Sequence, residues 1–309
     1  MPNQIHIPVL KQQLIDILNI KPNGIYVDCT AGFGGHSQLI AQKLNSQGKL
    51  ICIDQDINAI NHLKKLFNSY SNVLIVKDNF KNLDEILKDK KVDGIILDIG
   101  VSSLMFDDKS RGFSYHENGK LDMRMDLNQE LTAYQVINKY SQDQLVKMFE
   151  EYGEINDSWN VVQAIIKQRM IKPIETTLEL VDIIKQNIKK SQLFEKKHPA
   201  RLYFQALRIE VNDELNVLKK VLVESLKHLN KHARLAIITF HSLEDRIVKQ
   251  IFSKLTSSKD KYEKNIPLYE INQPQYKLLT KKAITANDQE LIDNHRSRSA
   301  KLRAIEKIS

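Results

Sequence analysis

The sequence predicts an α/β protein with a largely parallel sheet. In the first hundred residues, short apolar runs alternate with segments of helical periodicity, which is typical of βαβ units joined by right-handed crossovers. A long stretch of helical pattern then interrupts the alternation, and a second apolar strand pattern returns at residues 235–240. We therefore expect one α/β core that carries an inserted all-helical domain.

The elements expected in the first part follow one another closely, and each strand is an apolar run that is only four to seven residues long. Strands are expected at residues 24–29, 49–53, 73–76 and 92–98, and helices at 37–44, 57–67 and 83–87. Runs that are apolar throughout are typical of strands buried on both faces of a parallel sheet.

The middle of the chain has no strand signal between about residues 107 and 198. It contains two capping boxes, Ser141-x-x-Gln144 and Thr176-x-x-Glu179, which predict helix starts. After it we expect one long helix at about 199–229, the strand at 235–240, one or two strands within 276–284, and a basic tail at 294–309. The expected domains are therefore residues 1–106 and 199–309 for the two parts of the core, and 107–198 for the insertion.

A glycine-rich turn follows the first expected strand, in the run Asp28-Cys29-Thr30-Ala31-Gly32-Phe33-Gly34-Gly35-His36. Glycines without a β-carbon allow the backbone to turn tightly and to approach a ligand closely. Twenty residues after Gly34, Asp54 ends the second apolar strand, where a carboxylate can accept hydrogen bonds from ribose hydroxyls. Strand, glycine turn, helix, strand and acid together indicate a nucleotide-like cofactor.

The acid before the turn, Asp28, helps to distinguish between cofactors. The dinucleotide pattern places its glycines at a helix N-terminus that binds a diphosphate, without an acid just before them. A carboxylate at that position suits a cofactor with a positively charged amino acid end. The turn therefore favours S-adenosylmethionine over NAD.

Composition points to an anionic partner. Lys and Arg outnumber Asp and Glu by 46 to 38, and the formal net charge of +8 with a pI near 9.2 favours nucleic acid. The two cysteines, Cys29 and Cys52, fall in expected buried strands, where a thiol behaves as a small apolar group. No zinc-like spacing, signal peptide or membrane-spanning apolar run is found, so we expect a cytoplasmic protein without a metal or a membrane partner.

Several unusual strings lie in order along nearly the whole chain. They are His6-Ile7-Pro8-Val9-Leu10, Asp98-Ile99-Gly100-Val101-Ser102-Ser103, Arg111-Gly112-Phe113-Ser114, Leu121-Asp122-Met123-Arg124-Met125-Asp126, His198-Pro199-Ala200, Phe240-His241-Ser242-Leu243-Glu244-Asp245-Arg246 and Arg296-Ser297-Arg298-Ser299-Ala300. This set resembles the bacterial 16S ribosomal RNA cytosine-N4 methyltransferase family, also called the MraW or RsmH family. The resemblance implies a class I, Rossmann-like methyltransferase core with an inserted substrate-recognition domain, and S-adenosylmethionine as methyl donor. It also implies methylation of one decoding-centre cytosine of 16S ribosomal RNA in the small subunit.

The resemblance also implies which residues contact the cofactor. They are Gly34, Gly35, His36, Asp54, Phe80 and Asp98, with a further position at Met105, where the family usually has Gln. Asp54 would bind the ribose hydroxyls, Phe80 would pack on the adenine, and Asp98 would face the methionine end and the target amine.

Asp98 is also our candidate for the catalytic acceptor of the amine proton, because it ends the fourth strand, where ligands of open α/β sheets bind. It could instead cap a turn before Gly100. The candidate substrate-binding residues are Ser102, Ser103, His241, Arg296 and Arg298. The serines could close a turn, and His241 could have a purely structural role.

Cations that could meet RNA phosphates form two candidate patches, each of which could also be an ordinary solvated surface. One comprises Lys189, Lys190, Lys196, Lys197, His198 and Arg201, and the other Arg296, Arg298, Lys301 and Arg303.

Three alternative functions remain open from the residues alone. The first is a NAD-dependent oxidoreductase that uses the same glycine turn. The second is an RNA-binding assembly factor with a vestigial methyltransferase fold. The third is a methyltransferase of this fold that acts on DNA or on a protein amine.

Overall fold

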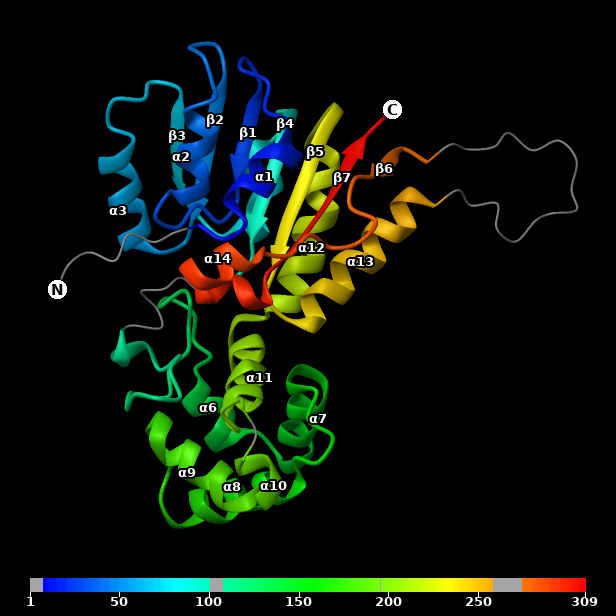
Figure 1. The fold of residues 1–309 in the computed structure, drawn as a ribbon. Coiled ribbons are helices and arrows are strands. Elements are labelled where there is room, and N and C mark those ends of the chain that lie inside the picture. The colour runs from blue at the N-terminus through cyan, green and yellow to red at the C-terminus, as the bar shows by residue number, and fades with distance from the viewer. Residues whose placement is uncertain (1–7, 101–107, 195, 258–273) are drawn as a thin grey trace, which may run out of the picture. The chain divides into compact units, whose positions relative to one another are not determined.

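The computed structural model describes residues 8–100, 108–194, 196–257 and 274–309 (Figure 1). The chain divides into two compact units. We call Met1–Gly100 together with Val217–Ser309 the core unit, and Val101–Asn216 the helical unit.

The core unit contains a sheet whose seven described strands are ordered β3-β2-β1-β4-β5-β7-β6. The strands are β1 Ile25–Asp28, β2 Lys49–Asp54, β3 Val73–Lys77, β4 Val92–Asp98, β5 Leu229–Thr239, β6 Tyr276–Leu278 and β7 Lys301–Lys307. Strands β1 to β5 are parallel to one another, and β7 runs antiparallel to both β5 and β6. The alternation of strands and helices expected from the sequence is therefore confirmed.

Helices cover both faces of this sheet (Figure 1). In the core unit they are α1 Lys11–Leu18, α2 Gly35–Ala41, α3 Ile57–Leu66, α4 Leu83–Leu87, most of α12 Glu214–His228, α13 Ser242–Thr256 and α14 Asp288–Asp293, with short 3-10 helices η1 Phe80–Asn82 and η4 His295–Ser299. In the part of the chain that the structure describes, no helix has both the length and the apolar character needed to cross a membrane.

Strand β2 shows why the inner positions of these strands are apolar. Leu50 and Cys52 face a cluster formed with α1, α2 and α3, whereas Ile51 and Ile53 face a second cluster formed with α4, α12 and α13. Successive residues of a strand point to opposite faces, and both faces are covered here. The strand therefore needs apolar residues at each of the positions from Leu50 to Ile53.

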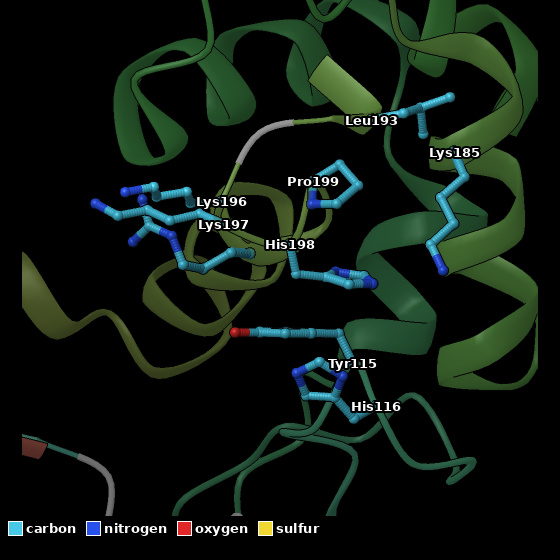
Figure 2. Close-up of a pocket in the computed structure, with 9 residues that line it drawn as sticks. Tyr115, His116, Lys185, Leu193, Lys196, Lys197, His198 and Pro199 are labelled. Carbon is cyan, nitrogen blue, oxygen red and sulfur yellow. The ribbon is translucent and has the colours of Figure 1, made fainter. Parts of the chain in front are cut away.

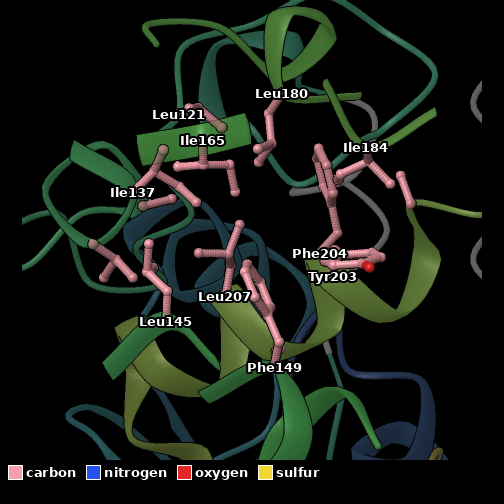
Figure 3. Packing of buried hydrophobic residues seen from close by; sticks show 14 of the residues in the cluster. Leu121, Ile137, Leu145, Phe149, Ile165, Leu180, Ile184, Tyr203, Phe204 and Leu207 are labelled. Carbon is pink, nitrogen blue, oxygen red and sulfur yellow. The ribbon is translucent and has the colours of Figure 1, made fainter. Parts of the chain in front are cut away.

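The helical unit has its own core, and Figure 3 shows its packing. Its elements are η2 Lys109–Arg111, α6 Ala133–Lys139, α7 Gln142–Gly153, α8 Trp159–Ile171, α9 Thr177–Asn187, α10 Lys190–Leu193 and α11 Arg201–Asn212. The capping boxes at Ser141 and Thr176 are confirmed, since each hydroxyl accepts a hydrogen bond from the backbone of the third helical residue. A third box, which the sequence analysis missed, starts α6 at Thr132.

The expected long helix at 199–229 is wrong, because the chain breaks it at Asp213. Asp213 has φ of 50°, in the left-handed region, and ends α11 before α12 begins. Asp is one of the few residues that reaches this region at modest cost. Helix α11 packs against α6 and α7 and places Phe204 and Leu207 in the core of the helical unit. Residues 199–212 therefore belong to that unit, although the sequence boundary assigned them to the second part of the core.

The expected basic tail at 294–309 also differs from the structure, because it contains β7. Leu302 and Ala304 are buried on one side of this strand. Between them, Arg303 pairs with Asp245 of α13 through two hydrogen bonds, with its Nε 2.6 Å from Asp245 Oδ1. Arg303, one of the charged residues that suggested a tail, therefore forms a structural ion pair with α13.

Candidate functional site

The glycine-rich turn lies between β1 and α2, at the carboxyl edge of the parallel strands. Gly32 and Gly34 have φ of 50° and 82°, in the left-handed region that glycine enters freely. A β-carbon on Gly34 would lie 2.5 Å from Cδ2 of Leu66, so that α3 packs directly against the backbone of the turn. The turn therefore requires glycine for its conformation and, at residue 34, for space.

Asp28 fixes the shape of this turn from within. Its side chain is buried, and its two oxygens accept hydrogen bonds from the Thr30 backbone at 3.1 Å and from the Ser37 hydroxyl at 2.6 Å. Burial raises the pKa of Asp28 to about 6, against the lowering effect of the Ser37 hydrogen bond. The first role of this acid is thus to link β1 to α2, a contact that the sequence analysis did not anticipate.

Asp54 lies at the end of β2 and ties the same turn to the neighbouring strand. Its Oδ2 accepts a hydrogen bond from the Gly32 N–H at 2.8 Å, and its Oδ1 accepts one from Asp56 N–H at 2.8 Å. Burial raises the pKa of Asp54, and these backbone hydrogen bonds oppose the rise. Each carboxylate oxygen has a second lone pair, so the group can still accept hydrogen bonds from a ligand.

Asp98 ends β4, which pairs with β1, and it lies beside the turn. Its backbone N–H donates to the Thr30 hydroxyl at 2.6 Å, which fixes the position of the Asp98 backbone. Asp98 Oδ2 lies 3.5 Å from Nε2 of His36, in the first turn of α2. This distance brings the two groups together without a hydrogen bond.

The atoms around this contact are buried and unpaired. Within the described residues, neither ring nitrogen of His36 nor Oδ1 of Asp98 has a hydrogen-bond partner. His36 is only 5 % exposed. A buried polar atom without a partner typically costs about 1 to 3 kcal/mol, and such groups are common where a protein receives a ligand.

Phe80 begins η1, just after β3, and is half-buried against the core cluster. The loop before it is joined to the end of β2, since Asp78 N–H donates to the Asp54 carbonyl at 3.0 Å. The ends of β1, β2, β3 and β4 therefore bring Gly34, His36, Asp54, Phe80 and Asp98 to one edge of the sheet. Gly35 starts α2 at this edge, and a β-carbon there would lie 3.0 Å from the Pro8 side chain.

The candidate substrate residues have other surroundings. His241 is the N-cap of α13, where its Nδ1 accepts a hydrogen bond from Glu244 N–H at 3.4 Å, so it has at least a structural role. Arg296 and Arg298 are exposed in η4. Ser102, Ser103 and Met105 lie outside the described residues.

Two residues of this edge were missed as functional candidates. Thr30 supports Asp98, and Ser37 joins Asp28 while also accepting from the Cys52 thiol at 3.3 Å. Thr30 lies within the glycine-rich run itself, two residues after Asp28, and this position was the available signal.

Taken together, the strand order with its antiparallel β7, the glycine turn and the acids at the carboxyl edge define a Rossmann-like, class I methyltransferase core. The chain belongs to the MraW methylase family, whose model matches residues 3–308.

Relatives agree over almost the full length. A protein of Ureaplasma parvum, named "Ribosomal RNA small subunit methyltransferase H", is 54% identical over 304 residues, which cover 97% of each chain. A protein of Clostridium botulinum with the same name is 49% identical over 310 residues, covering 98% of this chain and 99% of the relative. Among solved structures, an rRNA methylase from Streptococcus thermophilus covers 99% of both chains with a TM-score of 0.45 and 11% identity. The family expected from the sequence strings is confirmed.

Proposed function

We propose that this protein transfers a methyl group from S-adenosylmethionine to the exocyclic N4 amine of a decoding-centre cytosine, cytosine 1402, of 16S ribosomal RNA in the small subunit. Family membership supports methyl transfer, and the names of the relatives support ribosomal RNA as the substrate class. Such a substrate would place the protein in the cytoplasm.

The single observation that carries the proposal is the pair His36 and Asp98, whose buried atoms lack partners at the sheet edge beside the glycine turn. Asp28, Asp54 and Asp98 make this edge rich in carboxylates, which suits a cofactor with a sulfonium and an amino group. S-adenosylmethionine, when bound, supplies a methyl group on a positively charged sulfur that is already a strong electrophile. The residues present therefore fit this cofactor.

Each side chain of the edge has a distinct role in this proposal. Asp54 accepts hydrogen bonds from the ribose hydroxyls, and Phe80 packs on the adenine. Gly34, Gly35 and the backbone of His36 allow close approach of the cofactor to the turn. Asp98 faces the reacting end.

The cytosine amine is a weak nucleophile because its lone pair is delocalised into the ring. Orientation is therefore the main contribution of the protein, and well-oriented groups can supply roughly 7 to 11 kcal/mol. As the new nitrogen–carbon bond forms and the sulfur–carbon bond breaks, the amine must lose one proton. Asp98 accepts it from N4 through a hydrogen bond that also localises the lone pair.

The RNA side of the proposal involves exposed cations. Arg296 and Arg298 of η4 are available for phosphates, and Ser102 and Ser103 are the proposed contacts to the base. His241 would contact the substrate from the end of β5 in addition to capping α13. On the cofactor side, Met105 is the proposed further contact, at the position where the family usually has Gln.

The test is transfer of labelled methyl from S-adenosylmethionine to small subunits from a strain that lacks this protein, with the modified nucleoside identified by mass. We expect N4-methylated cytidine at a single site. Asp98→Asn should lower kcat by roughly 10² or more, while the exposed Asp89→Asn should match the unmodified protein. Transfer to another base, or to no RNA, would refute the proposed substrate.

A further inference from the structure

The helical unit contains an open hollow of about 600 Å³ (Figure 2). None of the residues that line it belongs to the proposed cofactor site. It is lined by Tyr115, His116, Lys185, Leu193, Lys196, Lys197, His198, Pro199 and Arg201. Six of these residues come from one stretch of the chain, between the end of α10 and the start of α11. They are Leu193, Lys196, Lys197, His198, Pro199 and Arg201.

One wall of the hollow is a set of stacked rings. The rings of Tyr115 and His198 lie nearly parallel, at 14° with centroids 4.8 Å apart. Phe204 supports Tyr115 edge-on at 5.7 Å, and the His116 ring lies 5.1 Å from the His198 ring. Figure 2 shows the flat His198 ring above Tyr115, with Leu193 and Lys185 beyond it. These rings thus form an aromatic layer along one side of the hollow.

The remaining lining is strongly cationic. Lys185, Lys196, Lys197 and Arg201 contribute four positive charges, and no acid lines the hollow among the described residues. The pKa of His198 is lowered, first by burial and then by the charges of Lys185 and His116, so its ring is mainly neutral at pH 7. A neutral imidazole in a field of lysines is suited to stacking, while the lysines attract anions.

The start of α11 adds to this anionic preference. Its N-cap residue, Ala200, provides no side-chain hydrogen bond to the helix terminus. Nε of Arg201 is buried and has no hydrogen-bond partner within the described residues. Helix N-termini and arginine both favour phosphate oxygens.

We propose that this hollow is a nucleotide subsite for single-stranded RNA, in which a base stacks on the His198–Tyr115 layer and the neighbouring phosphates bind the lysines and Arg201. An aromatic platform beside cations is the arrangement by which proteins bind unpaired strands without reading their sequence. An acidic peptide would use the cations but not the rings. The proposal rests on the proposed function, since the RNA bound here would be part of the methylated RNA.

Two pairs of variants separate stacking from charge. His198→Leu removes the flat ring, whereas His198→Phe keeps it. Lys196→Gln combined with Lys197→Gln removes two charges, and Lys139→Gln combined with Lys147→Gln is the matched control, because these exposed lysines of α6 and α7 do not line the hollow.

The first readout is binding of a fluorescein-labelled oligouridylate of about eight nucleotides. His198→Leu should weaken binding roughly tenfold and His198→Phe should retain it. The Lys196/Lys197 variant should reduce the slope of log affinity against log salt by roughly 1.4, at about 0.7 for each lost phosphate contact. Unchanged affinity for His198→Leu would overturn the stacking site, and an unchanged slope would overturn the phosphate contacts.

The second readout is methyl transfer to small subunits. We expect KM for the subunit to rise in His198→Leu and in the Lys196/Lys197 variant, while kcat and cofactor affinity stay near those of the unmodified protein. Variants that bind oligouridylate and subunits as the unmodified protein does would refute the subsite. Loss of methyl transfer in the unmodified protein, with the binding differences intact, would instead refute the proposed function and leave the subsite standing.

Discussion

Replacing Gly34 by Ala tests whether the glycine turn is limited by space as well as by conformation. Gly32 provides a matched comparison, because both residues lie in the left-handed region, with φ of 82° and 50°. A β-carbon on Gly34 would lie 2.5 Å from Cδ2 of Leu66 and 3.1 Å from Cδ2 of the fully buried Leu63. Among the described residues, a β-carbon on Gly32 would meet only the Thr30 carbonyl, at an ordinary 3.9 Å.

The free energies of unfolding should therefore differ. An alanine in the left-handed region costs about 1 to 2 kcal/mol, and the smaller entropy of the unfolded chain offsets roughly 0.4 to 1 kcal/mol of this. Gly32→Ala should thus lose about 1 kcal/mol. At Gly34 the overpacking adds about 1 to 3 kcal/mol, because the fully buried Leu63 must give way as well as Leu66. Gly34→Ala should lose about 2 to 4 kcal/mol.

Urea unfolding without cofactor measures both values, and isothermal titration with S-adenosylmethionine measures the consequence for binding. We expect Gly34→Ala to show the larger loss of stability and, since the α3 side chains beside the turn must be displaced, weaker cofactor binding. Equal losses of stability in the two variants would refute the argument from space. A Gly34→Ala protein of full stability would refute the described turn itself.

Two further predictions concern the acids of the edge. Thr30→Val leaves the Asp98 backbone N–H without its acceptor, so we expect a loss of about 1 to 3 kcal/mol in unfolding free energy together with a lower kcat. Thr30→Ser should preserve both, and equal behaviour of the two variants in urea unfolding and methyl transfer would argue against this contact. Because Asp28 has a folded pKa of about 6 against an ordinary 3.8, the folded state binds more protons between these values, and this group lowers stability as pH rises through the window. Relative to Asp28→Asn, the unmodified protein should therefore lose up to about 3 kcal/mol between roughly pH 4 and pH 7, measured by urea unfolding at each pH. A constant difference across that range would show that Asp28 is not buried as a carboxyl group.

The sequence predicted the parts of the fold that have a local pattern. The strands of the parallel sheet were found because burial on both faces makes consecutive inner positions apolar, as in residues 50–53 of β2. Strand β7 was not predicted, because its charged residues Lys301 and Arg303 alternate with buried ones. Both pair with Asp245 of α13, which is far away in the sequence. The break at Asp213 was also hidden, because neither glycine nor proline marks it.

The same distinction applies to the site. The glycine turn and the acid at the end of β2 follow one another at a spacing that can be read along the chain. The support of Asp98 by Thr30 could not be read in this way, because it joins residues 68 positions apart and depends on the register between β1 and β4. Contacts of this kind become visible only once the strands are paired.

The two proposed binding surfaces are built differently, and this difference makes their functions separable by experiment. At the cofactor edge, backbone N–H groups already hold Asp28 and Asp54 in place, so the acceptors are oriented before any ligand arrives. In the helical unit, the lysines of the hollow are long exposed side chains that act mainly through charge, apart from the fixed ring layer at His198. Changes at the edge should therefore alter cofactor affinity and kcat with little dependence on salt. Changes at the lysines should alter capture of RNA, and their effect should diminish as salt rises.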